Sequence, residues 1–337
     1  MKIVYIAPAY PPRIGGVEYV VKSVAERLAK AHEVTVIAGE PHAEKPCEEE
    51  INGVRVVRWP TWSPGGAYHL PRRRRELEKL LAELAREADV VHAHSAHTVL
   101  TVLSALHAKK AAPDTKLVVT LHYHGTGHTA IRKLLWIPWR RVVAECVEAA
   151  DKVHAVSRKE AELVQSHYPR AAGKLVVIPH GVEEDVVERK WKGQESDYMM
   201  YAGRIERYKR LELAVELAKK MELKLLIVGE GPHKEKLRRH AERYGNTEFL
   251  PPQPRHKYLD LLAQARYAVN PSAHEAFSIF TAEALAMGVP AITSATIKET
   301  LEARGEEIGN GLWLLKEAKI STWNEAVTQY VDKLYGK

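Results

Sequence analysis

Two kinds of segment alternate along the chain. Short runs such as KIVYIAP are almost continuously apolar, and longer segments such as RELEKLLAELARE carry apolar residues every three or four positions. The short runs are typical of parallel strands covered on both faces, and the longer segments predict amphipathic helices. Their repeated alternation predicts an α/β fold with doubly wound parallel sheets.

The alternation falls into two halves. In the first half the expected strands are 2–8, 33–39, 54–60, 89–94, 116–122, 151–157 and 174–181, and the expected helices include 17–31, 71–88, 98–110 and 129–149. In the second half the expected strands are 198–205, 224–231, 247–252, 265–272 and 290–295, with helices beginning at 211 and 233, covering 256–265 and following Ser278, and a last helix at 322–334.

The interruption between the halves predicts two domains. Residues 182–197 are charged and contain no clear strand, and 337 residues are more than one core usually serves. We therefore expect an N-terminal Rossmann-like domain (1–181), a linker (182–197) and a C-terminal Rossmann-like domain (198–320) across a cleft. The final segment (321–337) is expected as a helix able to pack back on the first domain.

Composition adds a preference for an anionic partner. The formal net charge is +7, which suits a nucleotide, a phosphate, a nucleic acid or a membrane surface. No stretch of 18 apolar residues is present, and the first apolar run is better explained as a strand than as a signal peptide. With Cys47 and Cys146 expected as free thiols, we expect a cytoplasmic protein that could lie on the inner face of the cell membrane.

Functional residues are expected just after strands, where open α/β sheets bind ligands. Gly15 and Gly16 lie between the first strand and the first helix, so backbone amides there could approach a phosphate. Gly203 and Arg204 follow the first strand of the second half, and Lys209 lies five residues after Arg204; two converging cations suit a diphosphate. The simpler interpretations are a flexible loop and a solvated basic turn.

The segment HEAFSIFTAEALAMGVP places two acids among small and apolar residues. Ser278 is expected to cap a helix whose amino end, from Phe277 onward, presents amides to an anion. Glu275 precedes that helix and Glu283 lies inside it; a carboxylate can accept two hydrogen bonds from a vicinal diol such as ribose. The alternative is that both acids pair with nearby Arg or Lys on the surface.

Histidines end two strands of the first half. His92, His94 and His97 follow one strand, and His122 and His124 follow the next. A transition-metal site is conceivable, but the sequence places no acidic ligand beside them. We therefore expect polar side chains that line a substrate cleft.

Aromatic and basic residues mix in two stretches of the first half. Arg72, Arg73, Arg74 and Arg75 open a helix, where cations oppose the helix dipole. Trp136 and Trp139 lie among four cations at 131–141. Both stretches suit an anionic membrane; alternatively the tryptophans are core residues and the arginines are solvated. No recognition module for nucleic acid accompanies them.

Together these motifs resemble the retaining nucleotide-sugar glycosyltransferases of family four, which have the GT-B architecture. The ordered set is GG after the first strand, DVVHAH, TLH, AVS, IPHGV, GR with a downstream Lys, VGEGP, two Glu eight positions apart, and EALAMGVP. It extends from residue 3 to about 315. The resemblance leaves the transferred sugar open, since Ala276 and Ser278 stand where the family often has glycine.

The resemblance implies roles for individual residues. Glu275 would contact the donor sugar, Glu283 the ribose, and His122 would lie beside the transferred sugar. Arg204 and Lys209 would stabilise the departing diphosphate. The other implied donor contacts are Gly15, Gly16, Gly203, Phe277 and Ser278, and the acceptor-side candidates are His92, His94 and His124.

The implied activity is transfer of a hexosyl unit from a UDP- or GDP-hexose, with retention, to an acceptor hydroxyl or phosphate, such as that of a lipid or lipid-linked glycan. The chain has no D-x-D pair, so neither a metal nor another cofactor is expected. A GT-B phosphorylase or a nucleotide-sugar epimerase is the alternative enzyme, and a sugar- or membrane-binding module is the alternative without catalysis.

Overall fold

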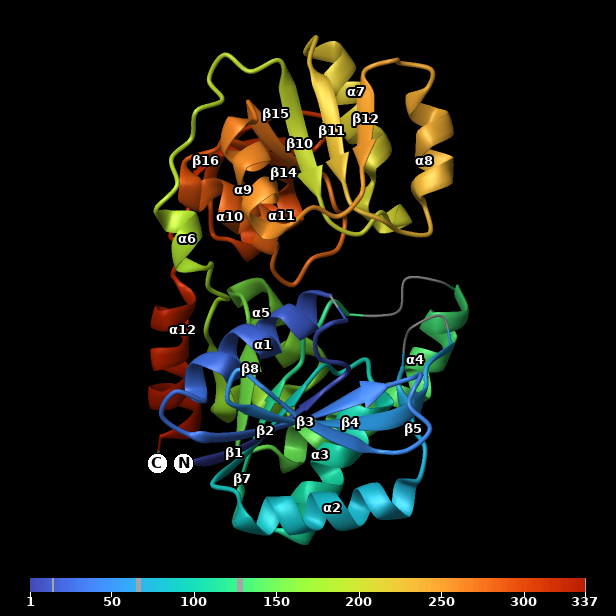
Figure 1. The fold of residues 1–337 in the computed structure, drawn as a ribbon, viewed down its shortest axis with the longest axis vertical. Coiled ribbons are helices and arrows are strands. Elements are labelled where there is room, and N and C mark those ends of the chain that lie inside the picture. Colours follow the sequence, from blue (N-terminus) through green and yellow to red (C-terminus); the bar gives the residue numbers. More distant parts are fainter. Residues whose placement is uncertain (14, 65–67, 126–129, 337) are drawn as a thin grey trace. The chain divides into compact units, whose positions relative to one another are not determined.

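The computed structural model describes residues 1–13, 15–64, 68–125 and 130–336. The chain folds into two compact units, of which unit 1 comprises Met1–Pro179 with Trp323–Lys337 and unit 2 comprises His180–Thr322 (Figure 1). Each unit has its own sheet and its own apolar core.

Unit 1 is built on a mostly parallel sheet with strand order β3-β4-β2-β1-β6-β7-β8-β9, with β5 paired to β4. Its strands are β1 (Lys2–Ala7), β2 (Glu33–Glu40), β3 (Cys47–Ile51), β4 (Val54–Trp62), β5 (Leu70–Pro71), β6 (Val90–His94), β7 (Lys116–Thr120), β8 (Lys152–Ala155) and β9 (Leu175–Val177). Its helices are α1 (Gly16–Leu28), α2 (Arg74–Glu87), α3 (Val99–Ala111), α4 (Ala130–Ala149), α5 (Arg158–His167), a 3₁₀ helix (Pro169–Lys174), α12 (Trp323–Gln329) and a π-helical turn (Tyr330–Tyr335). Helices α1 and α5 lie on one side of the sheet and α2 and α3 on the other (Figure 1), which explains the uninterrupted apolar runs of the central strands.

Unit 2 repeats this plan with strand order β12-β11-β10-β13-β14-β16-β15. Its strands are β10 (Tyr198–Ala202), β11 (Lys224–Val228), β12 (Thr247–Leu250), β13 (Tyr267–Asn270), β14 (Ala291–Ser294), β15 (Arg304–Gly309) and β16 (Leu312–Glu317). Its helices are α6 (Glu184–Val187), a 3₁₀ turn (Arg207–Lys209), α7 (Leu211–Lys220), α8 (Lys234–Ala241), α9 (Arg255–Gln264), α10 (Ile279–Met287) and α11 (Ala295–Thr300).

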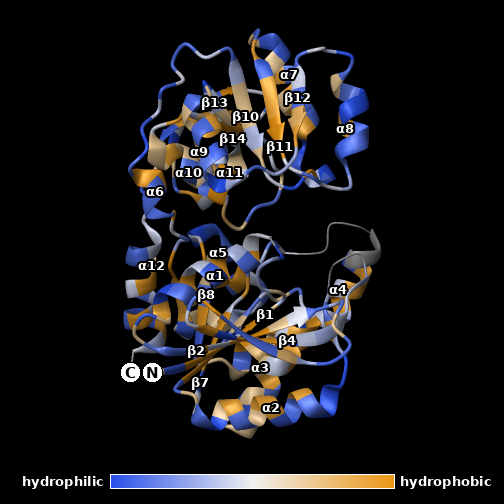
Figure 2. Ribbon diagram, in the orientation of Figure 1, coloured by the Kyte–Doolittle hydropathy of each residue, from blue (hydrophilic) through white to orange (hydrophobic). Residues whose placement is uncertain are grey.

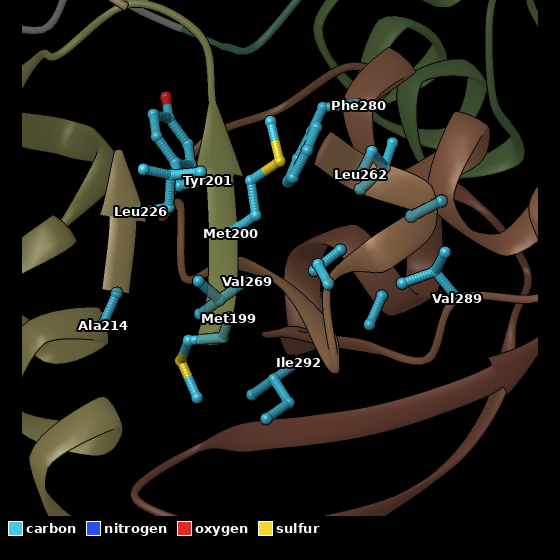
Figure 3. Packing of buried hydrophobic residues seen from close by; sticks show 14 of the residues in the cluster. Met199, Met200, Tyr201, Ala214, Leu226, Leu262, Val269, Phe280, Val289 and Ile292 are labelled. Atoms are coloured by element: carbon cyan, nitrogen blue, oxygen red, sulfur yellow. The ribbon is translucent and has the colours of Figure 1, made fainter. Parts of the chain in front are cut away.

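The core of unit 2 forms between its sheet and helices. Met200 of β10 lies beside Phe280 of α10, and Leu226 of β11 lies on the other side of β10 (Figure 3). Hydrophobic residues concentrate on the strands, whereas α8 is largely hydrophilic (Figure 2). Helix α8 buries only Leu237 and Ala241, as expected for a helix that covers the sheet with one narrow stripe.

Two antiparallel hairpins were not predicted. Strand β3 pairs with β4 through a turn at Asn52–Gly53, and β15 pairs with β16 through Asn310–Gly311. All four turn residues have positive φ, and Asn-Gly is the preferred sequence for such two-residue turns. The strands CEEEI and RGEEIG are polar and mostly exposed, so they lack the apolar run that identifies a buried strand; the two Asn-Gly pairs were the available signal.

The segment 182–197 belongs to unit 2 and is not a free linker. The Val182 amide donates to the Ser321 carbonyl at 2.9 Å, and the Trp191 amide donates to the Met287 carbonyl at 3.0 Å. Val182 and Val186 are fully buried. These apolar residues, scattered among charges, attach the segment to the unit; they are too far apart to form a pattern by themselves. In unit 1, Trp323, Tyr330 and Tyr335 of the final segment are buried.

Candidate functional site

In unit 2, the loops after β10 and β11 are packed backbone against backbone. A Cβ on Gly229 would lie 2.0 Å from the Gly203 carbonyl oxygen, and one on Gly231 would lie 2.3 Å from the Ile205 oxygen. Gly203 and Gly229 also have φ of +146° and +144°, which glycine tolerates far better than other residues. These glycines therefore let the loop that carries Arg204 approach its neighbour.

The centre of the unit 2 site is the ion pair between the Lys209 ammonium and the Glu275 carboxylate. Their side chains are only 13% and 14% exposed. Two hydrogen bonds to backbone carbonyls hold the two loops together: the Ala273 amide donates to the Tyr208 carbonyl at 2.9 Å, and the Arg210 guanidinium donates to the Pro271 carbonyl at 2.8 Å.

The charge of Lys209 is maintained by its surroundings. Burial alone would lower its pKa, but the Glu275 carboxylate, helped by Tyr201 and Tyr208, raises the pKa above its ordinary value. The Lys209 ammonium also lies 5.1 Å from the centre of the Tyr208 ring, within cation–π range. A half-buried cation that stays protonated is suited to bind an anion.

Arg204 occupies a different environment from Lys209. Its side chain is 68% exposed and pairs with Glu206 at 2.9 Å. The expected convergence of the two cations is therefore not present in this structure: they lie on one loop, but each contacts a different carboxylate. Because Arg204 is exposed, its guanidinium can change rotamer without disturbing the core.

Helix α10 begins as the sequence predicted. The Ser278 hydroxyl accepts a hydrogen bond from the Thr281 amide at 3.3 Å, and Asn270 donates to the same hydroxyl at 3.0 Å. The Phe277 ring packs edge-on against His180, with centroids 5.3 Å apart. The helix ends at Gly288 in the left-handed conformation.

Glu283 lies inside α10 and is 4% exposed. Tyr258 donates to one carboxylate oxygen at 2.5 Å, and Arg255 donates to the other at 3.1 Å. Burial raises the pKa of Glu283, and Tyr258 and Arg255 oppose that rise. Both acids of the segment thus have cationic partners, as the simpler interpretation expected, but Glu283 is buried and Glu275 is half-buried instead of lying on the surface.

Arg255 connects Glu283 to the segment that was expected as a linker. Its guanidinium also donates to both oxygens of Asp185 in α6, at 2.8 and 3.0 Å. Sequence analysis missed Arg255, Tyr258 and Asp185. Arg255 and Tyr258 lie on α9 and Asp185 lies on α6, and no spacing relates either segment to Glu283 before the chain is folded.

In unit 1, Gly15 and Gly16 open α1. Gly15 occupies the N-cap position and Gly16 is the first helical residue. A Cβ on Gly16 would meet no atom within 4 Å, so packing does not explain this glycine. One on Gly15 would lie 2.2 Å from an oxygen of the Glu18 side chain. The space beside Gly16 at the amino end of α1 is therefore open.

A buried arginine, also missed from sequence, anchors the loop before α1. Arg58 of β4 is 8% exposed, and its guanidinium donates to the carbonyls of Tyr10, at 3.3 Å, and Pro11. It also pairs with Glu49. The charge of Arg58 is thus paired within the protein, as a buried charge requires. The same guanidinium fixes the backbone of the loop that leads to Gly15.

The strand-end histidines form a hydrogen-bonded chain whose direction can be worked out. His154 Nε2 lies 2.8 Å from the Ile178 carbonyl, which can only accept, so His154 donates there and its Nδ1 accepts from Thr120 at 2.8 Å. Thr120 then accepts from His92 Nε2 at 2.7 Å, and His92 Nδ1 accepts from the Tyr335 hydroxyl at 2.7 Å.

This chain corrects the prediction for His92, which is 0% exposed and has both ring nitrogens bonded. Because its imidazole is fully buried and both nitrogens are bonded within unit 1, the residue cannot line an acceptor surface. His94 is also fully buried, with its Nδ1 3.2 Å from His122 Nε2. His124 is half-buried and stacks on His97 with ring centroids 4.2 Å apart.

No group of three or more His, Cys, Asp or Glu side chains suited to hold a metal occurs among the described residues. His122, the histidine expected beside the sugar, has a backbone φ of +47°. Burial lowers its pKa to about 3, with His154 contributing. It is therefore neutral at neutral pH and can donate or accept one hydrogen bond without bringing a charge.

The two basic and aromatic stretches differ in how they are exposed. The Arg73 and Arg74 side chains pair with Glu76 and Glu78, which offsets some of their repulsion by the dipole of α2. All four arginines of 72–75 are exposed. No helix in the described part of the chain is long and apolar enough to cross a membrane.

The membrane prediction is wrong for the two tryptophans of α4. Trp136 is 7% exposed and packs in the unit 1 core, and the Trp139 indole donates to the Ala96 carbonyl at 2.9 Å. The exposed apolar residues of this helix are instead Leu134, Leu135 and Ile137, at 68%, 55% and 65%. The helical period explains why these residues are exposed instead of the tryptophans, because residues adjacent to a buried position face outward.

Comparison with known proteins agrees with this architecture. Residues 14–186 match the family model described as Glycosyltransferase Family 4, and residues 183–333 match Glycosyl transferases group 1. An uncharacterised glycosyltransferase of Methanocaldococcus jannaschii is 27% identical over 93% of this chain and 85% of its own length. A GDP-mannose-dependent alpha-mannosyltransferase of Mycolicibacterium smegmatis is 26% identical over 87% and 79%, respectively.

Solved structures show the same fold. Sucrose-phosphate synthase from Thermosynechococcus elongatus aligns with a TM-score of 0.69 at 18% identity, covering 100% of this chain and 92% of that one. An Anabaena protein crystallised with UDP and glucose aligns with a TM-score of 0.66 at 16% identity, covering 100% and 93%. The two Rossmann-like units confirm the predicted GT-B fold class, and the chain belongs to glycosyltransferase family 4.

Proposed function

We propose that this glycosyltransferase moves a hexosyl unit from a UDP- or GDP-hexose to an acceptor with retention at the anomeric carbon, without a metal ion or other cofactor. The observation that carries the proposal is the half-buried pair of Lys209 and Glu275 beside the capped amino end of α10. A cation, a carboxylate and helix amides together suit a sugar diphosphate.

The chemistry of the donor gives these groups distinct tasks. Breaking the sugar–phosphate bond builds negative charge on the diphosphate, which the Lys209 ammonium and the amides of Phe277 and Ser278 would stabilise. When the phosphates bind Lys209, Glu275 is released to accept hydrogen bonds from the sugar hydroxyls. Exposed Arg204 would turn towards the phosphates.

The remaining roles follow the family pattern. Glu283 has two of its roughly four lone-pair sites engaged by Tyr258 and Arg255, so lone pairs remain for ribose hydroxyls. In unit 1, the open position above Gly16 suits a phosphate, and His122 would contact the transferred sugar. In the proposed reaction, retention results because the acceptor attacks from the face that the diphosphate leaves. The relative named as GDP-mannose-dependent supports GDP-mannose among the donors to test.

We expect one nucleoside diphosphate hexose to raise the thermal midpoint of the purified protein and to be hydrolysed slowly to the nucleoside diphosphate. A screen of UDP-, GDP- and ADP-hexoses with 10 mM EDTA would identify it, and proton NMR would read the anomer first released. Formation of the inverted anomer would contradict retention, and loss of activity on chelation would contradict metal independence. Sugar 1-phosphate formed only from glycan and orthophosphate would indicate a phosphorylase.

We also propose that the acceptor is a lipid or a lipid-linked glycan reached at an anionic membrane. The supporting observation is on α4, where exposed Leu134, Leu135 and Ile137 lie close in sequence to the cations Lys133 and Arg141. Apolar side chains that insert between lipids, together with cations that face the headgroups, are the features of an interfacial helix. The exposed arginines of 72–75 would add attraction to anionic lipids.

Flotation with liposomes is the measurement that checks this proposal. The protein should float with vesicles of anionic phospholipid and not with phosphatidylcholine alone, and a variant with serine at Leu134, Leu135 and Ile137 should lose most of that binding. Ile308→Ser, at a 39% exposed residue of unit 2, is the matched control and should float as the parent does. Equal flotation of the triple variant would exclude α4 as the contact.

A further inference from the structure

Glu160, in the first turn of α5, is buried at 2% exposure, and among the described residues its carboxylate is influenced by two backbone amides and by no cation. Its two carboxylate oxygens accept hydrogen bonds from backbone amides instead. One accepts from Val156 at 2.6 Å, and the other accepts from Tyr123. Glu160 therefore ties together the chain after β7 and the chain after β8, which are neighbouring strands.

The contact between Glu160 and the Tyr123 amide is not needed to cap α5. The Ser157 hydroxyl already caps the helix by accepting from the Glu160 amide at 3.1 Å. In an ordinary capping box, the glutamate would return this contact at the N-cap amide. Here its carboxylate binds the Val156 amide, one residue earlier, and an amide 37 positions away.

The Tyr123 amide belongs to the peptide group that joins His122 to Tyr123. Holding that group fixes the ψ angle of His122, and His122 already has φ in the left-handed region, which is unfavourable for a residue with a side chain. Such a conformation persists only when several contacts enforce it. The Tyr123 hydroxyl supplies another by donating to the Gly125 carbonyl at 2.9 Å.

We propose that Glu160 is a positioning residue that sets the orientation of His122 towards the transferred sugar. The inference rests on the proposed function, in which His122 contacts that sugar. Glu160 does not touch the donor in this scheme; it acts through one peptide group. Its carboxylate suits this role because the two amides bind different oxygens, and an amide side chain would place a donor NH2 at one of those positions.

A double-mutant cycle tests the proposal. Glu160→Gln keeps the shape but turns a donor NH2 towards one of the amides, so one hydrogen bond is lost. We expect at least a tenfold fall in kcat with an unchanged Kd for the nucleoside diphosphate identified in the donor screen. We expect His122→Ala to lower kcat as well, and the double variant to be no slower than His122→Ala alone, because both changes remove the same interaction.

Two controls separate positioning from stability. Ser157→Ala removes the cap of α5 and leaves the Tyr123 contact intact, so it should lower the thermal midpoint without changing kcat of the folded enzyme. Glu162→Gln, at an exposed residue of the same helix, should change neither quantity. If Glu160→Gln does not fold, Glu160→Asp, whose shorter side chain cannot reach both amides, takes its place in the cycle.

The possible results separate the proposed role of His122 from the proposed role of Glu160. If His122→Ala leaves kcat unchanged, the proposed role of His122 is wrong. A second outcome is that His122→Ala lowers kcat and that adding Glu160→Gln lowers kcat again, by the same factor as Glu160→Gln does in the parent enzyme. In that case Glu160 does not act through His122. If Glu160→Gln lowers only the thermal midpoint and kcat per folded molecule is retained, its role is structural.

Discussion

Replacing Lys209 with methionine is expected to reduce kcat by about 10²–10³, the usual effect of removing one preorganised charge that faces a developing anion. The ammonium is half-enclosed and its pKa is raised by Glu275, so it is a permanent positive charge at the place where the diphosphate is proposed to depart. The Kd for the nucleoside diphosphate should also rise. Single-turnover assays and calorimetric titration would measure the two effects.

The same substitution should lower stability, because it leaves the Glu275 carboxylate without its ion partner at 14% exposure. Adding Glu275→Gln to Lys209→Met removes that unpaired charge and should recover much of the stability but none of the activity. Lys224→Met is the control, since Lys224 forms an exposed pair with Asp197 in the same unit. Full activity in Lys209→Met would refute the proposed site.

Unit 1 is expected to lose stability steeply below about pH 6.5. Four of its histidines, of which His122 is half-buried and the other three are buried, have lowered pKa values, mainly because desolvation disfavours their charged forms: about 3 for His122, about 4 for His69 and His154, and well below the ordinary value for His92. In the unfolded chain such histidines bind protons below about pH 6.5. The unfolded state therefore binds more protons between pH 6.5 and these lower values.

This difference in bound protons sets the direction in which stability changes with pH. Each histidine contributes fully above pH 6.5, and the free energy of unfolding falls by about 1.4 kcal/mol per pH unit for each as the pH decreases through the window. Glu160 acts in the opposite direction, because burial raises its pKa to about 7, so its contribution is lost as pH rises from 4.5 to 7. Four histidines outweigh one carboxyl group, and the net result is acid instability.

Urea unfolding at several pH values, followed by tryptophan fluorescence, would measure this slope. Five of the seven tryptophans report on unit 1: Trp59, Trp62, Trp136, Trp139 and Trp323. His154→Gln, which can still donate to the Ile178 carbonyl, should reduce the slope between pH 5 and 6 by about 1.4 kcal/mol per unit. Exposed His256→Gln should not. A slope in His154→Gln equal to that of the parent would contradict the assignment of a neutral buried His154.

The strands and helices that build each core could be read from the chain, because burial on both faces leaves a continuous apolar run and a helix leaves a period near 3.6. The strands β3 and β15 could not be found this way. Their residues are mostly exposed and charged, so no burial pattern marks them, and their Asn-Gly turns carried the information instead. The prediction of a linker at 182–197 was wrong for a similar reason. The few apolar residues that attach this segment to unit 2 are scattered among charges and form no pattern.

For the site, local order in the sequence predicted the cap at Ser278 and the glycine turns, since a cap or a turn depends on residues a few positions apart. The partners of the functional side chains depend on residues far apart. Glu283 meets Tyr258 and Arg255, the loop before Gly15 is held by Arg58, and Glu160 reaches Tyr123. No spacing in the chain connects these pairs, because the fold alone brings their strands and helices together.

By itself, the sequence determined that this protein has two Rossmann-like units of family 4 type, and which loops follow the carboxyl ends of their strands. Only the tertiary structure decided which side chains on those loops are buried, which charges are already paired, and that α4 exposes leucine and isoleucine instead of tryptophan. The physical reason is that fold class is set by the periodic pattern of burial, whereas a site is set by contacts between residues distant in sequence, each adjusted to the dielectric and the hydrogen-bond partners of its final position.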